Sequence, residues 1–156
     1  MDATTMPSMS SLVAKLQADF PQFYFAASDD FRWSPQEKTI FYIETSNHIT
    51  SLLHEAAHAL LDHSTYNKDI ELLEMERDAW NYASSQLSKT YGIEIDDHTI
   101  QQSLDTYRDW LHARSTCPTC SAIGVQTEKH QYKCIACQTK WRVNDARICA
   151  LRRYTI

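Results

Sequence analysis

Two short cysteine pairs constrain this chain more than any other feature of its sequence. The 156 residues include five cysteines, and four of them form Cys117-x2-Cys120 and Cys134-x2-Cys137, with 13 residues between the pairs. Each pair can form a tight turn, and two pairs at this spacing can place four thiolates around one Zn²⁺ ion. Because sulfur takes all four positions of such a site, we expect it to stabilise a small module that lacks a core of its own.

The residues around the second pair support a zinc-ribbon module. The stretch "HQYKCIACQTKWRV" resembles the second half of a zinc ribbon, in which Tyr132, Trp141 and Val143 would pack around the metal. The fifth cysteine, Cys149, is isolated, and we expect it to be a small buried apolar residue without a ligand role. Paired cysteines at metal-binding spacing, rather than disulfide spacing, favour a reducing compartment. Together with the lack of a secretory leader or a membrane-length apolar run, this predicts a cytoplasmic protein that does not act at a membrane.

Charge is distributed unevenly along the chain. From His112 onward there are eight Lys or Arg residues against two acids, which leaves seven against 18 for residues 1–111 of the totals of 15 and 20. An acidic body is therefore followed by a basic tail. The tail contains Lys129, Lys133, Lys140, Arg142, Arg147, Arg152 and Arg153. A solvated basic face is one interpretation, and contact with nucleic acid, a partner protein or the acidic body is the other.

A second metal-binding pattern lies in the acidic body, in "LLHEAAHALLDH" from Leu52 to His63. His54 and His58 are one helical turn apart, so both imidazoles project from one face of a helix and can bind the same Zn²⁺. Glu55 points about 100° away around the helix, where it can reach metal-bound water without being a ligand. Such a cation lowers the pKa of its water and polarises a carbonyl, and Glu55 would transfer the proton to the leaving amine. The pattern thus predicts a zinc metallopeptidase with Glu55 as its catalytic base.

A catalytic zinc site has three protein ligands and one open position. The two histidines supply two of these ligands, so a third is needed. In the helix expected from about Lys68 to Tyr91, Glu76 falls on the apolar face, whereas most of the other acids fall on the polar face. A carboxylate on a core-facing stripe is costly unless it is paired or bound to metal, which favours Glu76. His63 is the competitor, but it is one residue short of the third histidine in H-E-x-x-H-x-x-G-x-x-H and lacks the glycine.

The remaining patterns predict an α+β protein with a zincin-like metallopeptidase core followed by a four-cysteine zinc ribbon. "FYFAAS" and "KTIFYIE" are expected to form a small antiparallel sheet, with an edge strand near "TIFYIE" that a substrate could extend. Gly92 is expected to end the long helix. We place the peptidase domain at residues 1–114 and the ribbon with its basic tail at residues 115–156. With only two glycines, Gly-rich phosphate-binding loops are excluded.

About residues 38–90 resemble the ImmA/IrrE family of metallopeptidases, on "TIFYIETSNHITSLLHEAAHALLDH" followed by "MERDAWNYASSQL". The resemblance implies that His54 and His58 bind zinc, that Glu55 is the general base and that Glu76 is the third ligand. It also implies a regulatory protein such as a repressor as substrate. The chain departs from the family pattern at Asp78, which stands for a second glutamate, and at Trp80, which stands for an Asn that helps to orient a ligand histidine.

Two alternatives stay open. An SprT-like protease acting on DNA-bound proteins also joins HExxH to a zinc ribbon, with a downstream histidine as third ligand, for which His98 and His112 are the candidates. The other alternative is a non-catalytic zincin scaffold whose ribbon binds DNA or a protein. We expect a peptidase with one catalytic and one structural Zn²⁺ and a protein or peptide substrate.

Overall fold

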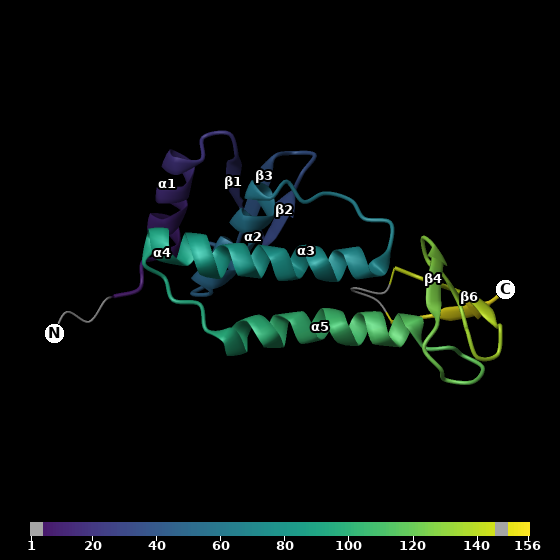
Figure 1. Cartoon of the computed structure of the whole chain (residues 1–156). Coiled ribbons are helices and arrows are strands. Elements are labelled where there is room, and N and C mark those ends of the chain that lie inside the picture. Colours follow the sequence, from purple (N-terminus) through teal and green to yellow (C-terminus); the bar gives the residue numbers. More distant parts are fainter. Residues whose placement is uncertain (1–4, 146–149) are drawn as a thin grey trace. The chain divides into compact units, whose positions relative to one another are not determined.

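A computed structural model describes residues 5–145 and 150–156. The chain is α+β, with helices and two small sheets (Figure 1). It forms two compact units, one of Met1–Ser64 with Met75–Asp97 and the other of Thr65–Glu74 with His98–Ile156. The unit that contains the cysteine pairs therefore also contains the long helix that precedes them, whereas the sequence places a division after residue 114. Arg147 and Cys149 lie outside the described residues.

The helices of the first unit begin and end at recognisable signals. Helix α1 spans Met9–Asp19, and the Ser8 hydroxyl accepts a hydrogen bond from the backbone N–H of Ser11 at 3.2 Å. Helix α2 spans Ile49–Leu60, with His48 at its N-cap and no side-chain cap hydrogen bond. Helix α3, Asp69–Tyr82, continues through the π-helical turn η1, Ala83–Leu87, into α4, Ser88–Tyr91. Gly92 ends this run with a φ of 66°, as predicted, because glycine adopts the left-handed conformation without strain.

The sheet of the first unit differs from the prediction. Its strands are β1 at Tyr24–Ala27, β2 at Arg32–Ser34 and β3 at Thr39–Tyr42, in the order β1-β3-β2. β1 is parallel to β3, and β2 is antiparallel to it. The expectations of a wholly antiparallel sheet and of an edge strand near "TIFYIE" were wrong. The segment between the two aromatic runs forms β2, so β3 is paired on both sides and β2 is an edge.

The core of the first unit joins α1, the sheet and the helices that follow. Side chains from α1, β3, α2 and α3 to α4 meet in one apolar cluster. Its most deeply buried members include Leu12, Leu16, Ile40, Leu52, Leu53, Ala57, Ala79 and Ala83. On α2 the apolar positions recur at helical spacing, so burying them fixes which way the polar side chains of the same helix point.

Besides residues 65–74, the second unit contains nearly all of α5, Asp97–Ser115, and a four-stranded antiparallel sheet. Its strands are β4 at Val125–Glu128, β5 at Gln131–Lys133, β6 at Lys140–Val143 and β7 at Arg153–Thr155. Trp141 and Tyr132 stack at 5.6 Å between ring centroids and form a small core with Val143 and two of the cysteines. Gly124 lies so close to Trp141 that a Cβ there would be 2.4 Å from the indole, so only glycine fits.

A buried ion pair joins the first turn of α3 to the end of α5 within the second unit. The Arg114 Nε donates to Asp69 Oδ2 at 2.8 Å, and both side chains are almost fully buried. The Tyr132 hydroxyl donates to the same oxygen at 2.5 Å, and burial together with this carboxylate raises the pKa of Tyr132. Because a buried charge is costly without a partner, these bonds explain why residues 65–74 belong with the cysteine-containing unit.

No helix in the described part of the chain is both long enough and apolar enough to cross a membrane.

Candidate metal centres

The first candidate centre, which we call the mixed site, consists of His54, His58 and Glu76. One potential ligand atom from each lies within 4.8 Å of the others. His54 Nε2 is 2.9 Å from Glu76 Oε2, His58 Nε2 is 3.1 Å from Glu76 Oε1, and the two Nε2 atoms are 3.1 Å apart. Two imidazole nitrogens and a carboxylate thus converge on one point, as expected for three ligands of a single cation.

Two helices supply this arrangement. His54 and His58 are one turn apart on α2, and their rings meet edge to face with centroids 4.5 Å apart. Glu76 comes from α3, three residues before the fully buried Ala79, and is only 6% exposed. The prediction that this glutamate points inward is confirmed, and the two histidines provide the partners that a buried carboxylate requires.

Contacts within the mixed site change the pKa values of Glu76 and His58. Burial acts to raise the pKa of Glu76, but hydrogen bonds with His54 and His58 outweigh it and lower the pKa below its usual range. For His58, burial acts to lower the pKa, and the bond to Glu76 reverses the effect, so the pKa is raised. The ionised carboxylate is therefore strongly favoured, which is the form that binds a cation.

The second ring nitrogen of His58, Nδ1, contacts His63. Its Nδ1 lies 2.8 Å from Nδ1 of His63, and the backbone carbonyl of His63 accepts a hydrogen bond from Trp33 Nε1 at 2.9 Å. Burial first, and then the charge of His58, lower the pKa of His63. A neutral His63 can accept the Nδ1 proton of His58 and so leave Nε2 of His58 free to bind a metal. His63 is thus outside the group of candidate ligands and is placed to orient His58.

The His54 ring, unlike that of His58, is positioned by stacking against an aromatic side chain. Trp80 stacks on its imidazole with centroids 4.1 Å apart and an angle of 22° between the planes. Nδ1 of His54 is buried and has no hydrogen-bond partner among the described residues. Trp80 therefore provides a stacking surface for the His54 ring.

Glu55 lies beside the mixed site and outside the ligand group. Burial raises the pKa of Glu55, the charges of His54 and His58 act to lower it, and that of Glu76 to raise it. The backbone of Trp33 in β2 also hydrogen-bonds this carboxyl and lowers its pKa. A carboxyl group whose pKa is raised is better suited to accept and return a proton than an ordinary surface carboxyl. The edge strand β2 therefore lies next to the predicted base.

The second candidate centre, the thiol site, consists of Cys117, Cys120, Cys134 and Cys137. All four are free cysteines whose sulfurs lie within 4.8 Å of one another. The closest pairs are Cys120 with Cys134 at 3.5 Å and Cys117 with Cys137 at 3.7 Å, far longer than a disulfide bond. Four thiols held this close can be stabilised together by a cation that takes up their negative charge.

The two cysteine pairs have the same backbone structure. In the first, Thr119 N–H donates to Cys117 Sγ at 3.4 Å, and in the second, Ala136 N–H donates to Cys134 Sγ at 3.4 Å. Each turn closes with a residue in the left-handed conformation, Ser121 and Gln138. Burial acts to raise the pKa of Cys117, but backbone N–H groups and neighbouring thiols lower it to about 6. The backbone thus favours a thiolate, the form that binds metal.

All seven ligand residues that the sequence predicts are brought together, three in one group and four in the other. Neither group includes His98 or His112, the downstream histidines considered for the SprT-like alternative. Sequence reasoning did not identify His63 and Trp33 as supports of the site. The spacing of His63 from His58 contains no signal for this role, because the chain reverses direction after α2, where Asp62 takes a φ of 54°.

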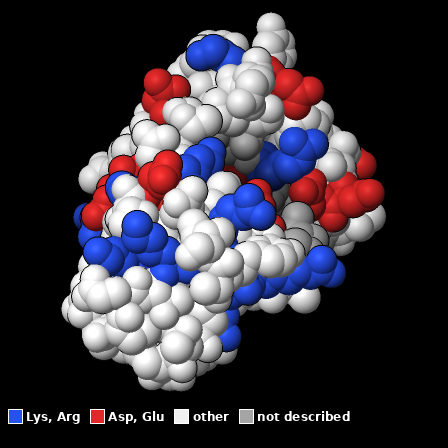
Figure 2. Space-filling view, turned by 90° about the vertical axis from the view of Figure 1, so that its right-hand side faces the viewer, with Lys and Arg blue, Asp and Glu red and all other residues white. Residues whose placement is uncertain are grey.

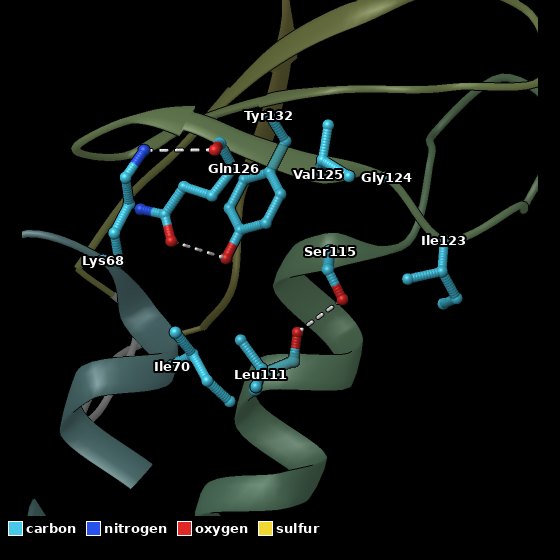
Figure 3. Close-up of a pocket in the computed structure, with 9 residues that line it drawn as sticks. All are labelled: Lys68, Ile70, Leu111, Ser115, Ile123, Gly124, Val125, Gln126 and Tyr132. Carbon is cyan, nitrogen blue, oxygen red and sulfur yellow. Dashed lines mark hydrogen bonds between the residues drawn. The ribbon is translucent and has the colours of Figure 1, made fainter. Parts of the chain in front are cut away.

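A cavity of about 350 Å³ in the second unit differs from the mixed site in the residues that line it (Figure 3). Aliphatic side chains of Ile70, Leu111, Ile123 and Val125 line much of it. Its polar groups already have partners, since Lys68 Nζ donates to the carbonyl of Gln126 at 3.1 Å and the Ser115 hydroxyl to that of Leu111 at 2.8 Å. The cavity lacks a cluster of reactive groups, so the mixed site is the better candidate for chemistry.

Comparisons of the chain with protein-family models, curated proteins and solved structures gave no match.

Proposed function

We propose that this protein is a zinc-dependent peptidase whose reaction takes place at the mixed site. The observation that carries the proposal is the convergence of His54 Nε2, His58 Nε2 and a Glu76 oxygen, with Glu55 next to His54 in the chain. Three protein ligands leave a position for water or substrate, whereas a purely structural site has four. The resemblance to ImmA/IrrE peptidases supports the same assignment.

The geometry of both sites fits Zn²⁺. Ligands about 2.0–2.1 Å from a tetrahedral zinc are about 3.3 Å from one another, and thiolates at about 2.3 Å are about 3.8 Å apart. In the mixed site the two Nε2 atoms are 3.1 Å apart and lie 2.9 and 3.1 Å from Oε2 and Oε1 of Glu76, and in the thiol site two sulfur pairs are 3.5 and 3.7 Å apart. Nitrogen with carboxylate in one site, and sulfur alone in the other, are donor sets that zinc accepts.

When bound, zinc supplies an acidic water molecule and polarises the carbonyl of the scissile bond. Glu55 would take a proton from that water and deliver it to the leaving amine. The Glu55 carboxyl would serve as a base first and as an acid afterwards. His63 keeps His58 oriented toward the site through the Nδ1 contact.

An extended peptide would align along β2. This strand is an edge of its sheet, and the backbone of its Trp33 is close to the Glu55 carboxyl. A peptide strand added to the edge of a sheet is aligned by backbone hydrogen bonds, which would place its carbonyls in register beside the site. A regulatory protein such as a repressor is the substrate that the family resemblance suggests.

The experiment combines metal analysis with cleavage. Wild type, Glu55→Gln and Glu76→Ala are analysed for zinc by elemental mass spectrometry, with Glu74→Ala as a control because Glu74 is exposed on the same helix. We expect two zinc ions per chain in wild type, Glu55→Gln and Glu74→Ala, and one in Glu76→Ala. Each protein is then incubated with a proteome-derived peptide library, and new termini are identified by mass spectrometry.

Loss of the base should lower the cleavage rate by roughly 10² to 10⁴ while both zinc ions remain. Cleavage that is unchanged in Glu55→Gln would contradict the proposed role of this residue. Two bound zinc ions without cleavage by wild type would leave the non-catalytic binding scaffold as the better explanation.

A further inference from the structure

The outer face of the sheet in the second unit carries cations in a regular arrangement. Along β6 exposed and buried residues alternate, with Lys140 and Arg142 exposed and Trp141 and Val143 buried. The register places Lys133 of β5 directly opposite Lys140, and Tyr154 of β7 directly opposite Arg142. Cross-strand partners lie on the same face of a sheet, so these four side chains form one surface, which we call the basic face.

The two lysines of the basic face are an unfavourable pair. Like charges directly opposite each other in a sheet destabilise it. Within residues 5–145 and 150–156, none of Lys133, Lys140 and Arg142 takes part in an ion pair. Among the described cross-strand neighbours on this face the one acid is Glu128, which is paired with Gln131 at the far side of β5. Bound anions would remove the repulsion.

An exposed aromatic ring accompanies the cations. Tyr154 is 43% exposed, and the Arg142 guanidinium lies 5.6 Å from its ring centroid. Large apolar groups are also exposed nearby, since Val125 lies opposite Lys133 and the Ile156 N–H donates to the Lys140 carbonyl at 3.0 Å. Figure 2 shows Lys and Arg side chains reaching the surface at several places beside large uncharged areas.

We propose that the basic face binds single-stranded nucleic acid, with Lys133, Lys140 and Arg142 contacting phosphates and Tyr154 stacking on a base. Cations beside an exposed aromatic ring match a chain of phosphates that carries unpaired bases. An acidic protein segment would satisfy the cations but would leave the tyrosine ring without a matching group. In a duplex the base faces are covered by their neighbours, so Tyr154 could not stack on them.

Binding is measured by fluorescence anisotropy on the full zinc-loaded chain, with fluorescein-labelled oligo(dT) and oligo(U) of equal length as probes. With three cations neutralising phosphates, the affinity should fall about 20-fold between 50 and 200 mM salt, from a slope of about 0.7 per contact. The DNA and RNA probes distinguish the two sources of single strands. A duplex of the same length and poly-L-glutamate serve as competitors.

The decisive variant is Lys140→Glu with Arg142→Glu. It places an acid opposite Lys133, so the sheet should be at least as stable as in wild type, which thermal unfolding checks. The matched control is Lys15→Glu with Lys89→Glu, the same charge change at exposed lysines of the first unit. We expect at least a tenfold loss of affinity in the first variant and less than a twofold loss in the control.

Variants of Tyr154 test how much stacking contributes to the affinity, separately from charge. Tyr154→Ala should weaken binding about tenfold, and Tyr154→Phe should retain it, because a phenyl ring also stacks. Equal losses in the charge variant and its control would overturn the proposal. So would displacement of the oligonucleotide by poly-L-glutamate or by the duplex as effectively as by unlabelled oligo(dT).

Discussion

The mixed site and the thiol site each gather metal-binding groups, but they are built in opposite ways. The thiol site contains four equivalent donors on two turns that repeat the same hydrogen bonds, including the N–H to sulfur bonds of Thr119 and Ala136. The mixed site contains three unlike donors on two helices, with Glu55 beside them. A set of four donors is complete and suits a structural role, whereas three donors next to a base leave a position for chemistry.

The two sites also differ in what keeps their ligands in place. In the thiol site, the local backbone of each cysteine pair positions the sulfurs. In the mixed site, orientation depends on the side chains around the imidazoles, through His63 behind His58 and Trp80 of α3 against His54. The comparison indicates that changes to the cysteine turns should disrupt the thiol site, and that changes to the side chains around the histidines should tune the mixed site.

The largest expected effect is the loss of one thiol ligand. Cys134→Ser should remove one zinc ion and unfold the sheet of the second unit, because binding of structural zinc contributes about 10–16 kcal/mol to the folding of small zinc modules. Limited proteolysis and elemental analysis measure the outcome. Cys149→Ser is the control and should keep both zinc ions, and a Cys134→Ser protein with both ions and an intact second unit would contradict the structural role.

A smaller effect is expected when His58 loses its partner. His63→Ala should weaken zinc binding at the mixed site about 10- to 100-fold, as is typical when the hydrogen-bond partner of a ligand histidine is removed. His63→Gln should recover part of the affinity, because its amide oxygen can accept the Nδ1 proton. Competition with a chelator of known affinity measures both variants. An equal loss from the thiol site would show that the effect is general unfolding.

The smallest effect concerns the ring that supports His54. Trp80→Leu should lower zinc affinity at the mixed site about two- to tenfold, since an aromatic pair contributes about 0.5–1.5 kcal/mol beyond its buried area. Trp80→Phe retains a stacking ring and should bind zinc nearly as well as wild type. Chelator competition again supplies the measurement, and a Phe variant as weak as the Leu variant would argue against stacking as the support.

The fold was predictable where the signal was local. The helical spacing of apolar residues predicted α2 and the inward position of Glu76, and Gly92 was correctly expected to end the long helical run. The topology of the first sheet was not predictable in this way. Periodicity identifies a strand but not its neighbours, so a three-residue strand such as β2, between turn-forming residues, was not predicted, and β3 was wrongly given an edge position.

The sequence by itself identified the candidate ligand residues of both sites, because residue type and spacing within a helix or a tight turn are local properties. Only the tertiary structure decided what surrounds them. It brought His63 and the edge strand β2 to the mixed site, left Nδ1 of His54 without a partner among the described residues and placed Lys133 opposite Lys140. These features depend on how helices pack and which strands pair, and neither follows from residue spacing alone.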